Sequence, residues 1–481
     1  MKLKDILKNV PLKCIHADLE MDIETVVYDS RKATPGCMFV AVTGFASDGN
    51  RFIPMAVEKG AAIIVSAKAP KTDVPYVVVE SDRLALALIG ANFYGNPAKT
   101  MKMIGVTGTN GKTSTTLLLK HVIETVLGAK TGLIGTMENL VGDRVIPTER
   151  TTPESFDLQG LFATMRDAAC THVIMEVSSH ALSLDRVGGV HYDVAAFTNL
   201  TEDHLDFHNT MEEYCDAKAM LFARCDKAVM NCDDPWFERM AKQATCPVLT
   251  TSAHGEASLY ATDVQMFADG VQFTAHYGSE EEKVSLPIPG KFTVYNALSV
   301  LGIARQLGIS LRDAAAALAT AKGVKGRVEV VPTPGKPYTV LIDYAHTPDA
   351  LENVLKTVRG FAAGRIIAVF GCGGDRDRTK RPQMGEIAAK LADIAVVTSD
   401  NPRTEDPHEI IGEILTGMSG PAETVVIENR IEAIGWALRQ AQRGDVVVLC
   451  GKGHETYQEI RSEKYHLDER EIVSEYMKNH S

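Results

Sequence analysis

A glycine-rich turn followed by a lysine and a threonine stands at the start of a predicted helix. Its residues are Gly108, Thr109, Asn110, Gly111, Lys112, Thr113 and Ser114, and an apolar run at 101–106 precedes them. Glycines let backbone N–H groups approach phosphate oxygens, a lysine can reach the terminal phosphates, and a threonine hydroxyl can bind Mg²⁺. Val106 occupies the first glycine position of G-x-x-x-x-G-K-[ST], so the pattern predicts a variant phosphate loop. An ATPase and a kinase stay open, whereas the absence of N-K-x-D argues against a GTPase.

A second predicted strand, at 172–177, carries one acid near its carboxyl end, Glu176. An unpaired buried carboxylate would cost several kcal/mol. We therefore expect a cation beside Glu176, either Mg²⁺ at the phosphate loop or a structural Lys or Arg. His204 and His208 are four residues apart after the next strand, but no third ligand is arranged as a zinc enzyme needs, so zinc is not expected.

A lysine falls on the apolar side of the predicted helix 212–224. On a helical projection Lys218 lies between Tyr214 and Phe222, on the side opposite Asp216. A solvated or snorkelling side chain is the ordinary alternative for a helical lysine. In an apolar setting the pKa of the amine falls, which leaves a neutral amine that can be modified.

The pattern of elements predicts an α/β protein of three domains. Short strands at 38–42, 61–65 and 76–80 indicate a small N-terminal domain, residues 1–97, which ends at a cluster of turn formers. Strands alternate with helices through a central domain, residues 98–328, with an antiparallel excursion at 255–290. Residues 329–481 repeat the alternation in a second doubly wound unit, with strands at 338–343, 365–370, 393–398, 424–427 and 445–450. Ligands of such sheets bind beyond the carboxyl ends of the strands.

Composition excludes several classes of protein. The 481 residues carry a net charge of −12, so no global positive field would hold a nucleic acid or an anionic membrane. Apolar runs are far shorter than the roughly 20 residues of a membrane span, and no signal-peptide pattern is present. The nine cysteines are scattered without a C-x-x-C pair, which favours reduced thiols in the cytoplasm.

Taken together, these motifs resemble the Mur ligases, the ATP-dependent amino-acid ligases of peptidoglycan synthesis, over essentially the whole chain. The motifs, in the family's order, are Gly108-Thr-Asn-Gly-Lys-Thr113, Glu176-Val-Ser-Ser-His180, Asn199-Leu-Thr-Glu-Asp-His-Leu-Asp206, Tyr295-Asn296-Ala297, Gly326-Arg327-Val328-Glu329, Asp343-Tyr-Ala-His-Thr-Pro-Asp349 and Gly451-Lys-Gly-His-Glu455. Asp400-Asn401-Pro402-Arg403, with the last of these, resembles the members that add meso-2,6-diaminopimelate.

The resemblance implies a reaction and a division of labour. The N-terminal domain would bind the UDP sugar, the central domain ATP, and the Rossmann-like C-terminal domain the amino acid. ATP would phosphorylate the γ-carboxylate of UDP-N-acetylmuramoyl-L-alanyl-D-glutamate, and the amine of diaminopimelate would displace phosphate. By resemblance the catalytic residues are Lys112, Lys218 and His204, and the Mg²⁺ ligands are Thr113, Glu176, His204 and Lys218, the last as a carbamate.

The remaining binding residues also come from the resemblance. In addition to the phosphate loop, Gly108 to Ser114, ATP would contact Asn296, Arg327 and Asp343. The UDP substrate would contact Ser30, Thr151, Thr152, Ser178 and Arg186. The amino acid would contact Arg376, Asp400, Asn401, Pro402, Arg403, Gly451 and Glu455. Leu184 stands where some relatives have Gln, so that contact is not transferred.

We expect this ligase to be a monomer. Three other functions remain as alternatives. The first is the member of the same family that adds L-lysine. The second is folylpolyglutamate synthase, which predicts neither a complete UDP domain nor the sequence D-N-P-R. The third is a P-loop regulatory protein that hydrolyses ATP without forming an amide.

Overall fold

The structure is a computed structural model that describes residues 1–44, 48–148, 150–461 and 463–480, apart from the side chain of Asp206. Contacts divide the chain into two compact units. The first comprises Met1–Tyr260 with Leu298–Ala314, and the second comprises Ala261–Ala297 with Ala315 onward. The predicted domain boundaries at residues 97 and 328 stay predictions. No helix in the described segments has both the length and the apolar character needed to cross a bilayer.

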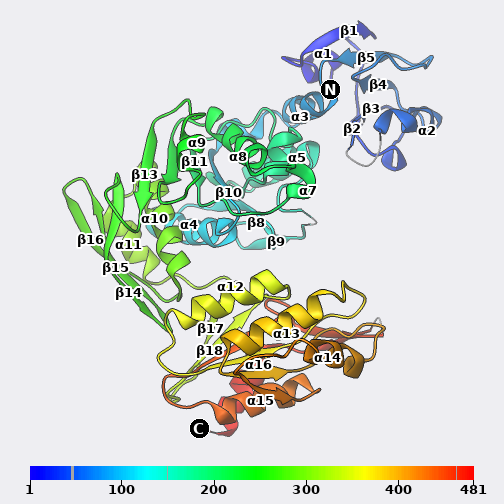
Figure 1. The fold of residues 1–481 in the computed structure, drawn as a ribbon. Coiled ribbons are helices and arrows are strands. Elements are labelled where there is room, and N and C mark those ends of the chain that lie inside the picture. Colours follow the sequence, from blue (N-terminus) through cyan, green and yellow to red (C-terminus); the bar gives the residue numbers. More distant parts are fainter. Residues whose placement is uncertain (45–47, 149, 462, 481) are drawn as a thin grey trace. The chain divides into compact units, whose positions relative to one another are not determined.

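A five-stranded sheet forms the N-terminal part of the first unit (Figure 1). Its strands, in spatial order, are β1 (Leu12–His16), β5 (Tyr76–Val79), β4 (Ile63–Ser66), β3 (Cys37–Ala41) and β2 (Thr25–Val27). All neighbours are parallel except β1, which runs antiparallel to β5. The helical segments of this part are α1 (Leu3–Ile6), η1 (Ser30–Lys32), η2 (Gly49–Phe52), α2 (Ile53–Glu58) and α3 (Asp82–Phe93). The Ser81 hydroxyl caps α3 by accepting from Leu84 N.

A mixed sheet, parallel around its central strand β6 (Lys102–Thr107) and antiparallel at β8 (Asn139–Val141) and β9 (Arg144–Ile146), carries the phosphate loop. Its neighbours β10 (His172–Glu176) and β11 (Val194–Phe197) both run parallel to it. The outer strands are β7 (Thr131–Ile134), β8 and β9 beyond β10, and β12 (Ala228–Asn231) and β13 (Val248–Ser252) beyond β11. The carboxyl ends of β6, β10 and β11 therefore meet at one edge, as parallel strands require.

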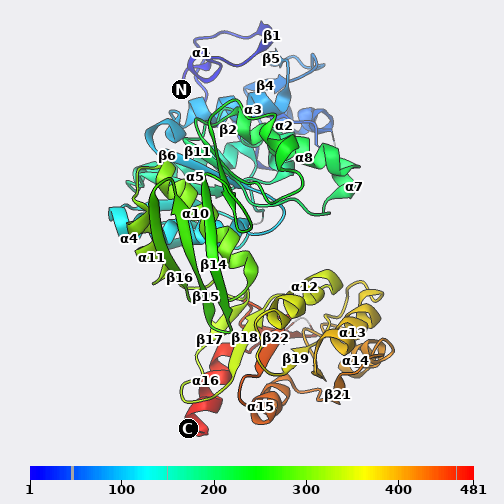
Figure 2. The same ribbon diagram turned by 60° about the vertical axis from the view of Figure 1, so that its left-hand side comes forward.

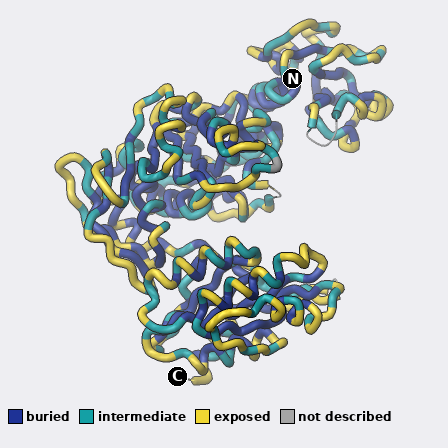
Figure 3. The backbone as a smooth tube through the Cα atoms, in the orientation of Figure 1, coloured by how far each residue is buried: buried dark blue, intermediate teal, exposed yellow. Residues whose placement is uncertain are grey.

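Helices accompany this sheet, and its strands β6, β10, β11 and β12 are buried along nearly their whole length. Figure 3 colours the chain by burial. The helical segments are η3 (Pro97–Thr100), α4 (Lys112–Leu127), α5 (Ser155–Asp167), α6 (Ser179–Ser183), α7 (Leu205–His208), α8 (Met211–Ala219), η4 (Met220–Ala223), α9 (Phe237–Ala241), α10 (Lys291–Gln306) and α11 (Leu311–Leu318). The predicted helix 212–224 is interrupted, because the chain tightens into a 3₁₀ turn at Met220. The excursion predicted at 255–290 forms β14 (Leu259–Phe267), β15 (Gly270–Tyr277) and β16 (Glu280–Leu286), with β15 and β16 antiparallel.

The second unit contains a six-stranded sheet covered on both faces. Its strand order is β17 (Glu329–Val331), β18 (Thr339–Asp343), β22 (Val446–Cys450), β19 (Ile366–Phe370), β20 (Ile394–Val397) and β21 (Glu423–Val426). One face packs on α12 (Pro348–Arg359), α13 (Lys380–Leu391) and α14 (Pro407–Leu415), and the other on α15 (Arg430–Gln440) and α16 (Glu469–Asn479), as Figure 2 shows. A hairpin of β23 (Tyr457–Ile460) and β24 (Glu463–His466) follows β22. The predicted α/β class with mostly parallel sheets is confirmed.

Candidate active site

The phosphate loop depends on glycine at two positions. Gly108 has φ +144°, and a Cβ there would lie 2.0 Å from Thr198 Oγ1 on the loop after β11. Gly111, with φ +84°, is the last residue before α4 begins at Lys112. Only glycine adopts such backbone angles freely. The chain therefore passes tightly from β6 into α4, and the amino end of that helix lies at the loop, where it favours an anion.

Two lysine amines share one loop carbonyl. Lys112 Nζ donates to Gly108 O at 2.9 Å and to Thr109 O at 2.8 Å. Lys218 Nζ, from α8, donates to Gly108 O at 2.9 Å. Burial lowers the pKa of Lys112, while the negative charges of Glu176 and Asp203 oppose that shift. Two ammonium groups that bind the same carbonyl oxygen would repel each other, so we expect one of the two amines to be neutral.

Lys218 is the better candidate for the neutral amine. Its side chain is 2% exposed, and its Nζ lies 4.5 Å from the centre of the Tyr214 ring. Burial lowers the pKa of Lys218 well below its ordinary value, and the charge of Lys112 lowers it further. The Tyr214 hydroxyl is 3.2 Å from Thr109 Oγ1, which ties α8 to the loop. The placement predicted from helical periodicity holds, and a snorkelling side chain is excluded.

Glu176 is buried among neutral donors. Its Oε1 accepts from Thr113 Oγ1 at 2.9 Å and from Thr136 N at 3.0 Å, and its Oε2 accepts from Thr136 Oγ1 at 2.8 Å. Within the described chain Glu176 forms no ion pair with Lys or Arg, which removes the alternative of a structural salt bridge. A Cβ on Gly135 would come 2.6 Å from Glu176 Oε1, so glycine permits this close approach.

The Thr113 hydroxyl and the Glu176 carboxylate provide oxygen donors for a hard cation. They touch at 2.9 Å, and both belong to the edge that carries the phosphate loop. In the described residues no group of three or more His, Cys, Asp or Glu could enclose a metal ion. A cation here would need phosphate oxygens and water as its other ligands, which is how Mg²⁺ commonly binds. The residues present therefore fit Mg²⁺ bound together with a nucleotide.

Among the described residues, His204 forms no hydrogen bond or ion pair with Thr113 or Glu176. It begins α7 with φ +55°, its side chain is half exposed, and its Nε2 is 3.4 Å from Asp203 Oδ2. The Tyr214 ring connects it to Lys218, because the His204 and Tyr214 ring centres are 6.2 Å apart. His208, by contrast, is buried, with Nε2 2.9 Å from Ser179 Oγ. The two histidines thus have different surroundings.

Burial of His208 makes stability depend on pH. Burial above all, with a smaller effect of the neighbouring His180 and His204, lowers the pKa of His208 from 6.5 to about 4, and the charge of Glu213 opposes this shift. Below pH 6.5 the unfolded chain binds a proton that the folded protein binds only near pH 4. Stability should therefore fall as the pH drops through this interval, by on the order of 2 kcal/mol.

Urea unfolding between pH 7 and pH 4, compared with His208→Gln, checks this expectation. The variant should lose distinctly less stability over the interval. His191→Gln, at an exposed histidine bound to Asp226, should keep the wild-type slope. Equal slopes for the wild type and His208→Gln would show that His208 is not the source.

Four of the five predicted UDP-substrate residues come together beside Glu176. Thr152 Oγ1 donates to Glu176 O at 2.8 Å and accepts from Ser178 N at 3.2 Å. Arg186 Nη1 donates to Thr152 O at 3.3 Å, and Thr151 Oγ1 is 3.0 Å from Thr136 Oγ1.

Ser30, the fifth, opens η1 in the N-terminal part of the unit, where it is buried against Met55 Sδ at 3.4 Å. It makes no hydrogen bond to the other four within the described chain. The hydroxyl of nearby Tyr28 does reach α5, where it donates to Asp157.

In the second unit, a pocket of about 570 Å³ gathers most of the predicted amino-acid-binding residues. Those that line it are Arg376, Asp400, Asn401, Arg403, Gly451 and Glu455. Pro402 lines a neighbouring pocket instead. The pocket lies at the carboxyl ends of β19, β20 and β22, which precede the three loops that supply these residues. Ligands of open α/β sheets bind at this edge.

A buried lysine organises the floor of this pocket. Lys452 is fully buried, and its Nζ donates to Asn401 Oδ1 at 2.7 Å and to Glu455 Oε2 at 3.1 Å. Asn401 Nδ2 also donates to Glu455 Oε2, at 2.9 Å. Asp400 Oδ2 is buried without a hydrogen-bond partner. The lysine therefore fixes Glu455 and Asn401 relative to each other.

Arg403 is held on two sides but keeps free donors. Its Nε donates to Glu459 Oε2 at 3.1 Å and its Nη1 to Gly374 O at 2.8 Å. Its φ of +51° is fixed by pairing with β23, because Arg403 N donates to Glu459 O and Arg461 N to Arg403 O. Nη2 has no partner among the described residues. The end of the guanidinium is thus available to an anion in the pocket, while Arg376 is exposed at its rim.

The other predicted ATP-binding residues lie in the second unit. Asp343 is buried and accepts from Val328 N and Ala345 N, both at 2.8 Å, and burial raises its pKa. The Arg327 guanidinium lies 5.4 Å from the centre of the Tyr344 ring, and Asn296 is buried on α10. Asp343 therefore fixes the backbone at residue 328, a structural role that its sequence motif did not indicate.

Comparison with known proteins identifies the family of the chain. Family models match three segments: the Mur ligase family catalytic domain at 22–94, the Mur ligase middle domain at 106–304, and the Mur ligase glutamate ligase domain at 326–453. UDP-N-acetylmuramoyl-L-alanyl-D-glutamate--2,6-diaminopimelate ligase 1 of Clostridium acetobutylicum is 48% identical over 481 residues, 99% of each chain. The chain belongs to the Mur ligase family.

Two further relatives agree. The UDP-N-acetylmuramoyl-L-alanyl-D-glutamate--2,6-diaminopimelate ligase of Caldanaerobacter subterraneus subsp. tengcongensis is 47% identical, over 99% of each chain. A solved structure of a ligase of the same name has a TM-score of 0.79 and 32% identity, covering 100% of this chain and 99% of that one. Membership of the Mur ligases is thus supported from one end of the chain to the other.

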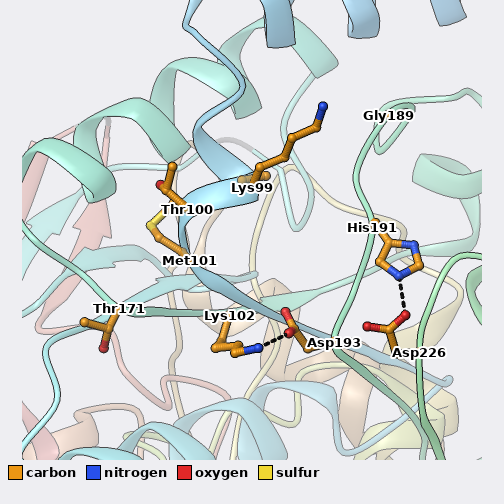
Figure 4. A pocket seen from close by; sticks show the side chains of 10 residues that line it. Lys99, Thr100, Met101, Lys102, Thr171, Gly189, His191, Asp193 and Asp226 are labelled. Atoms are coloured by element: carbon orange, nitrogen blue, oxygen red, sulfur yellow. Dashed lines mark hydrogen bonds and ion pairs between the residues drawn. The ribbon is translucent and has the colours of Figure 1, made fainter.

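A further pocket lies at the wrong edge for a Mur ligase active site. It measures about 370 Å³ and lies where β6 and β11 begin, beside the ion pairs Lys102–Asp193 and His191–Asp226, both at 2.7 Å (Figure 4). The phosphate loop follows the opposite end of β6. The pocket is therefore not a candidate for the nucleotide.

Sequence reasoning missed three residues that hold candidate site residues in place within the two units. Thr136 binds both oxygens of Glu176, Lys452 bridges Asn401 and Glu455, and Glu459 holds Arg403. Thr136 follows β7 at the ligand-binding edge, a position that inspecting each strand end would have found. Lys452 stands inside the motif Gly451-Lys-Gly-His-Glu455, but that motif assigned it no role, and Glu459 had no signal of its own in the sequence.

Proposed function

We propose that the protein uses ATP to join meso-2,6-diaminopimelate to the D-glutamate γ-carboxylate of UDP-N-acetylmuramoyl-L-alanyl-D-glutamate. The observation that carries this proposal is the 570 Å³ pocket, which both the Arg403 guanidinium and the Glu455 carboxylate line. The distal end of diaminopimelate carries a carboxylate and an ammonium, so it matches this pair in charge. The names of full-length relatives at 47% and 48% identity support the same substrates.

The chemistry takes place in two steps. A γ-carboxylate oxygen attacks the terminal phosphorus of ATP, the bond to ADP breaks, and an acyl-phosphate forms. The neutral amine of diaminopimelate then attacks the acyl carbon, phosphate leaves with the C–O bond electrons, and the amine proton is released. Both steps create negative charge on oxygen, so the enzyme must orient reactants and stabilise charge. The loop N–H groups at the start of α4 and Lys112 are suited to that task.

Mg²⁺ would be held by Thr113 and Glu176, and it would neutralise charge on the phosphates. Thr136 keeps the Glu176 carboxylate in one orientation through two hydrogen bonds. Lys112, whose amine lies on the loop carbonyls of Gly108 and Thr109, has only to swing away from them to reach a phosphate. His204, by its partial exposure, is available to complete a second cation site.

Lys218 would act as a carbamate. Its neutral amine attacks CO₂, a C–N bond forms, and a proton is released, so a base becomes an anion with two oxygen donors. The product also gains an attraction, because an anion then stands next to the ammonium group of Lys112. Carbamate oxygens are ligands that Mg²⁺ accepts, whereas an ammonium is not.

We further propose that the enzyme works as a monomer in the cytoplasm. Its substrates include a nucleotide sugar and ATP. All nine cysteines are free thiols, which suits a reducing compartment.

The stoichiometry of the reaction tests the proposed function. With ATP, Mg²⁺, the UDP-dipeptide and diaminopimelate, we expect one ADP and one phosphate for each amide formed. Little ADP should form when either the UDP-dipeptide or diaminopimelate is omitted. ADP release without an amide would favour a P-loop regulatory protein. In a parallel incubation with a folate and glutamate, addition of glutamate to the folate would favour folylpolyglutamate synthase.

A further inference from the structure

Arg83 is a nearly buried cation that none of the assignments above uses. It belongs to the first turn of α3, and its side chain is 16% exposed. Its Nε donates to Thr43 O at 3.1 Å and its Nη1 to Leu184 O at 3.4 Å. Arg83 thus connects α3 to Leu184, the residue directly after α6, and Ser178 caps the other end of α6.

Three arginines converge on one carboxylate oxygen. Glu154 Oε2 lies 3.5 Å from Arg186 Nε, 3.6 Å from Arg83 Nη1 and 3.9 Å from Arg150 Nη1. Charge-assisted hydrogen bonds measure about 2.7–2.9 Å, so none of these three contacts is one. Glu154 therefore orients the guanidinium groups without using up their donors.

The cluster has an excess of positive charge. Three guanidinium groups face one carboxylate, and the Nε of Arg186 is buried without a hydrogen-bond partner. Burial lowers the pKa of Arg186, and the charges of Arg150 and Arg83 also lower it, while only Glu154 and Tyr28 oppose them. Withdrawing cations from water is costly unless an anion compensates them. The cluster is therefore built to receive an anion.

A short chain of hydrogen bonds connects the arginine cluster to the phosphate loop. Arg186 donates to Thr152 O, and the Thr152 hydroxyl donates to Glu176 O. Glu176 in turn accepts from Thr113 of the phosphate loop. The cluster is thus two residues from the loop where phosphoryl transfer would take place. An anion there would belong to the peptide end of the UDP substrate.

We infer that Arg83 is a specificity-determining residue that, with Arg186, binds the α-carboxylate of the substrate's D-glutamate. This inference rests on the proposed function. The γ-carboxylate must reach the phosphate loop, and the α-carboxylate is the remaining anionic group at that end of the peptide. Gripping it would fix the residue so that only the γ-carboxylate meets ATP.

Two UDP-dipeptides and two proteins test the inference. One ligand ends in D-glutamate, and the other in D-isoglutamine, whose α-carboxylate is an amide. We expect the wild type to bind the first on the order of 100-fold more tightly in calorimetry, because the amide strands buried donors and loses a charge. Arg83→Gln should bind the carboxylate ligand on the order of 100-fold more weakly than the wild type does, but its affinity for the amide ligand should fall by less than about threefold. The reason is that the substitution in the protein and the amide in the ligand each remove the same contact, between Arg83 and the α-carboxylate.

Kinetic and structural controls separate this role from a merely structural one. In assays of ligation, Arg83→Gln should raise KM for the UDP-dipeptide while the KM values for ATP and diaminopimelate stay unchanged. Arg224→Gln, which removes a similarly half-buried arginine paired with Asp185, should retain the wild-type preference for the carboxylate. If Arg83→Gln does not fold, Arg83→Lys serves, and it should reduce that preference by about tenfold because the planar fork is lost.

Equal losses of affinity for both ligands would overturn the inference, because Arg83 would then only tie Thr43 to Leu184. A wild type that binds both ligands equally would overturn it as well. Failure of the proposed function gives a different result: the carboxylate ligand would bind preferentially, but no amide would form with diaminopimelate.

Discussion

Lys218→Ala should lower the rate of ligation by on the order of 10³-fold or more, a larger loss of turnover than we expect from any other single substitution. The substitution removes the carbamate and with it an anionic ligand beside the phosphate loop. The second consequence is that Lys112 loses the anion next to it. Acetate or another short-chain acid should restore part of the activity, because a free carboxylate can occupy the space that the carbamate left.

A matched control separates this effect from the loss of any buried lysine. Lys120 on α4 is also nearly buried, but it pairs with Glu124 at 2.6 Å, and in the described part of the chain its amine forms no hydrogen bond or ion pair with the phosphate loop. Lys120→Ala should change stability and leave turnover within about threefold of the wild type. Near-normal turnover of Lys218→Ala would contradict the carbamate role, as would the absence of rescue by every short acid.

Arg403→Ala should remove the preference for diaminopimelate over L-lysine. Nη2 of Arg403 has no hydrogen-bond partner among the residues that the structure describes, and Nη1 has a second N–H, so the end of the guanidinium can hold the distal carboxylate by two hydrogen bonds. Lysine lacks that carboxylate and would present only an ammonium to Arg403. The wild type should therefore discriminate by on the order of 10³-fold in kcat/KM, and the variant should lose most of this through a higher KM for diaminopimelate.

The control for this prediction lies at the other edge of the same sheet. Arg359 forms an ion pair with Asp393 at 2.7 Å, at the amino end of β20. Arg359→Ala should retain the full preference for diaminopimelate. Unchanged diaminopimelate kinetics in Arg403→Ala would refute the assignment, and so would a wild type that uses lysine equally well.

Local patterns allowed the phosphate loop and the strand edges to be predicted from the sequence. A glycine turn between an apolar strand and a helix has one compact solution, and Lys218 was placed by helical periodicity alone. The interruption of its helix at Met220 was not predictable, because the 3₁₀ turn has no breaker residue. Periodicity indicates which side of a helix is buried but not where its last hydrogen bond lies.

The partners of buried charges could not be read from the sequence. The buried Glu176 carboxylate was expected to have a partner. Whether that partner is a cation or three neutral hydrogen-bond donors depends on where β7 ends, because Thr136 follows this strand. The same holds for the contacts of Lys452 with Asn401 and of Glu154 with Arg83, because each of these two contacts joins segments far apart in the chain. Residue type limits what a charge requires, and tertiary structure decides which residue supplies it.

The central claim is tested most directly by one competition. Purified protein is incubated with ATP, Mg²⁺, UDP-N-acetylmuramoyl-L-alanyl-D-glutamate and equal concentrations of meso-diaminopimelate and L-lysine, and the nucleotide products are identified by mass spectrometry. The two products differ in mass by one carboxyl group. We predict that essentially all of the product carries diaminopimelate. A product carrying mainly lysine, or consumption of ATP without any amide, would contradict the account.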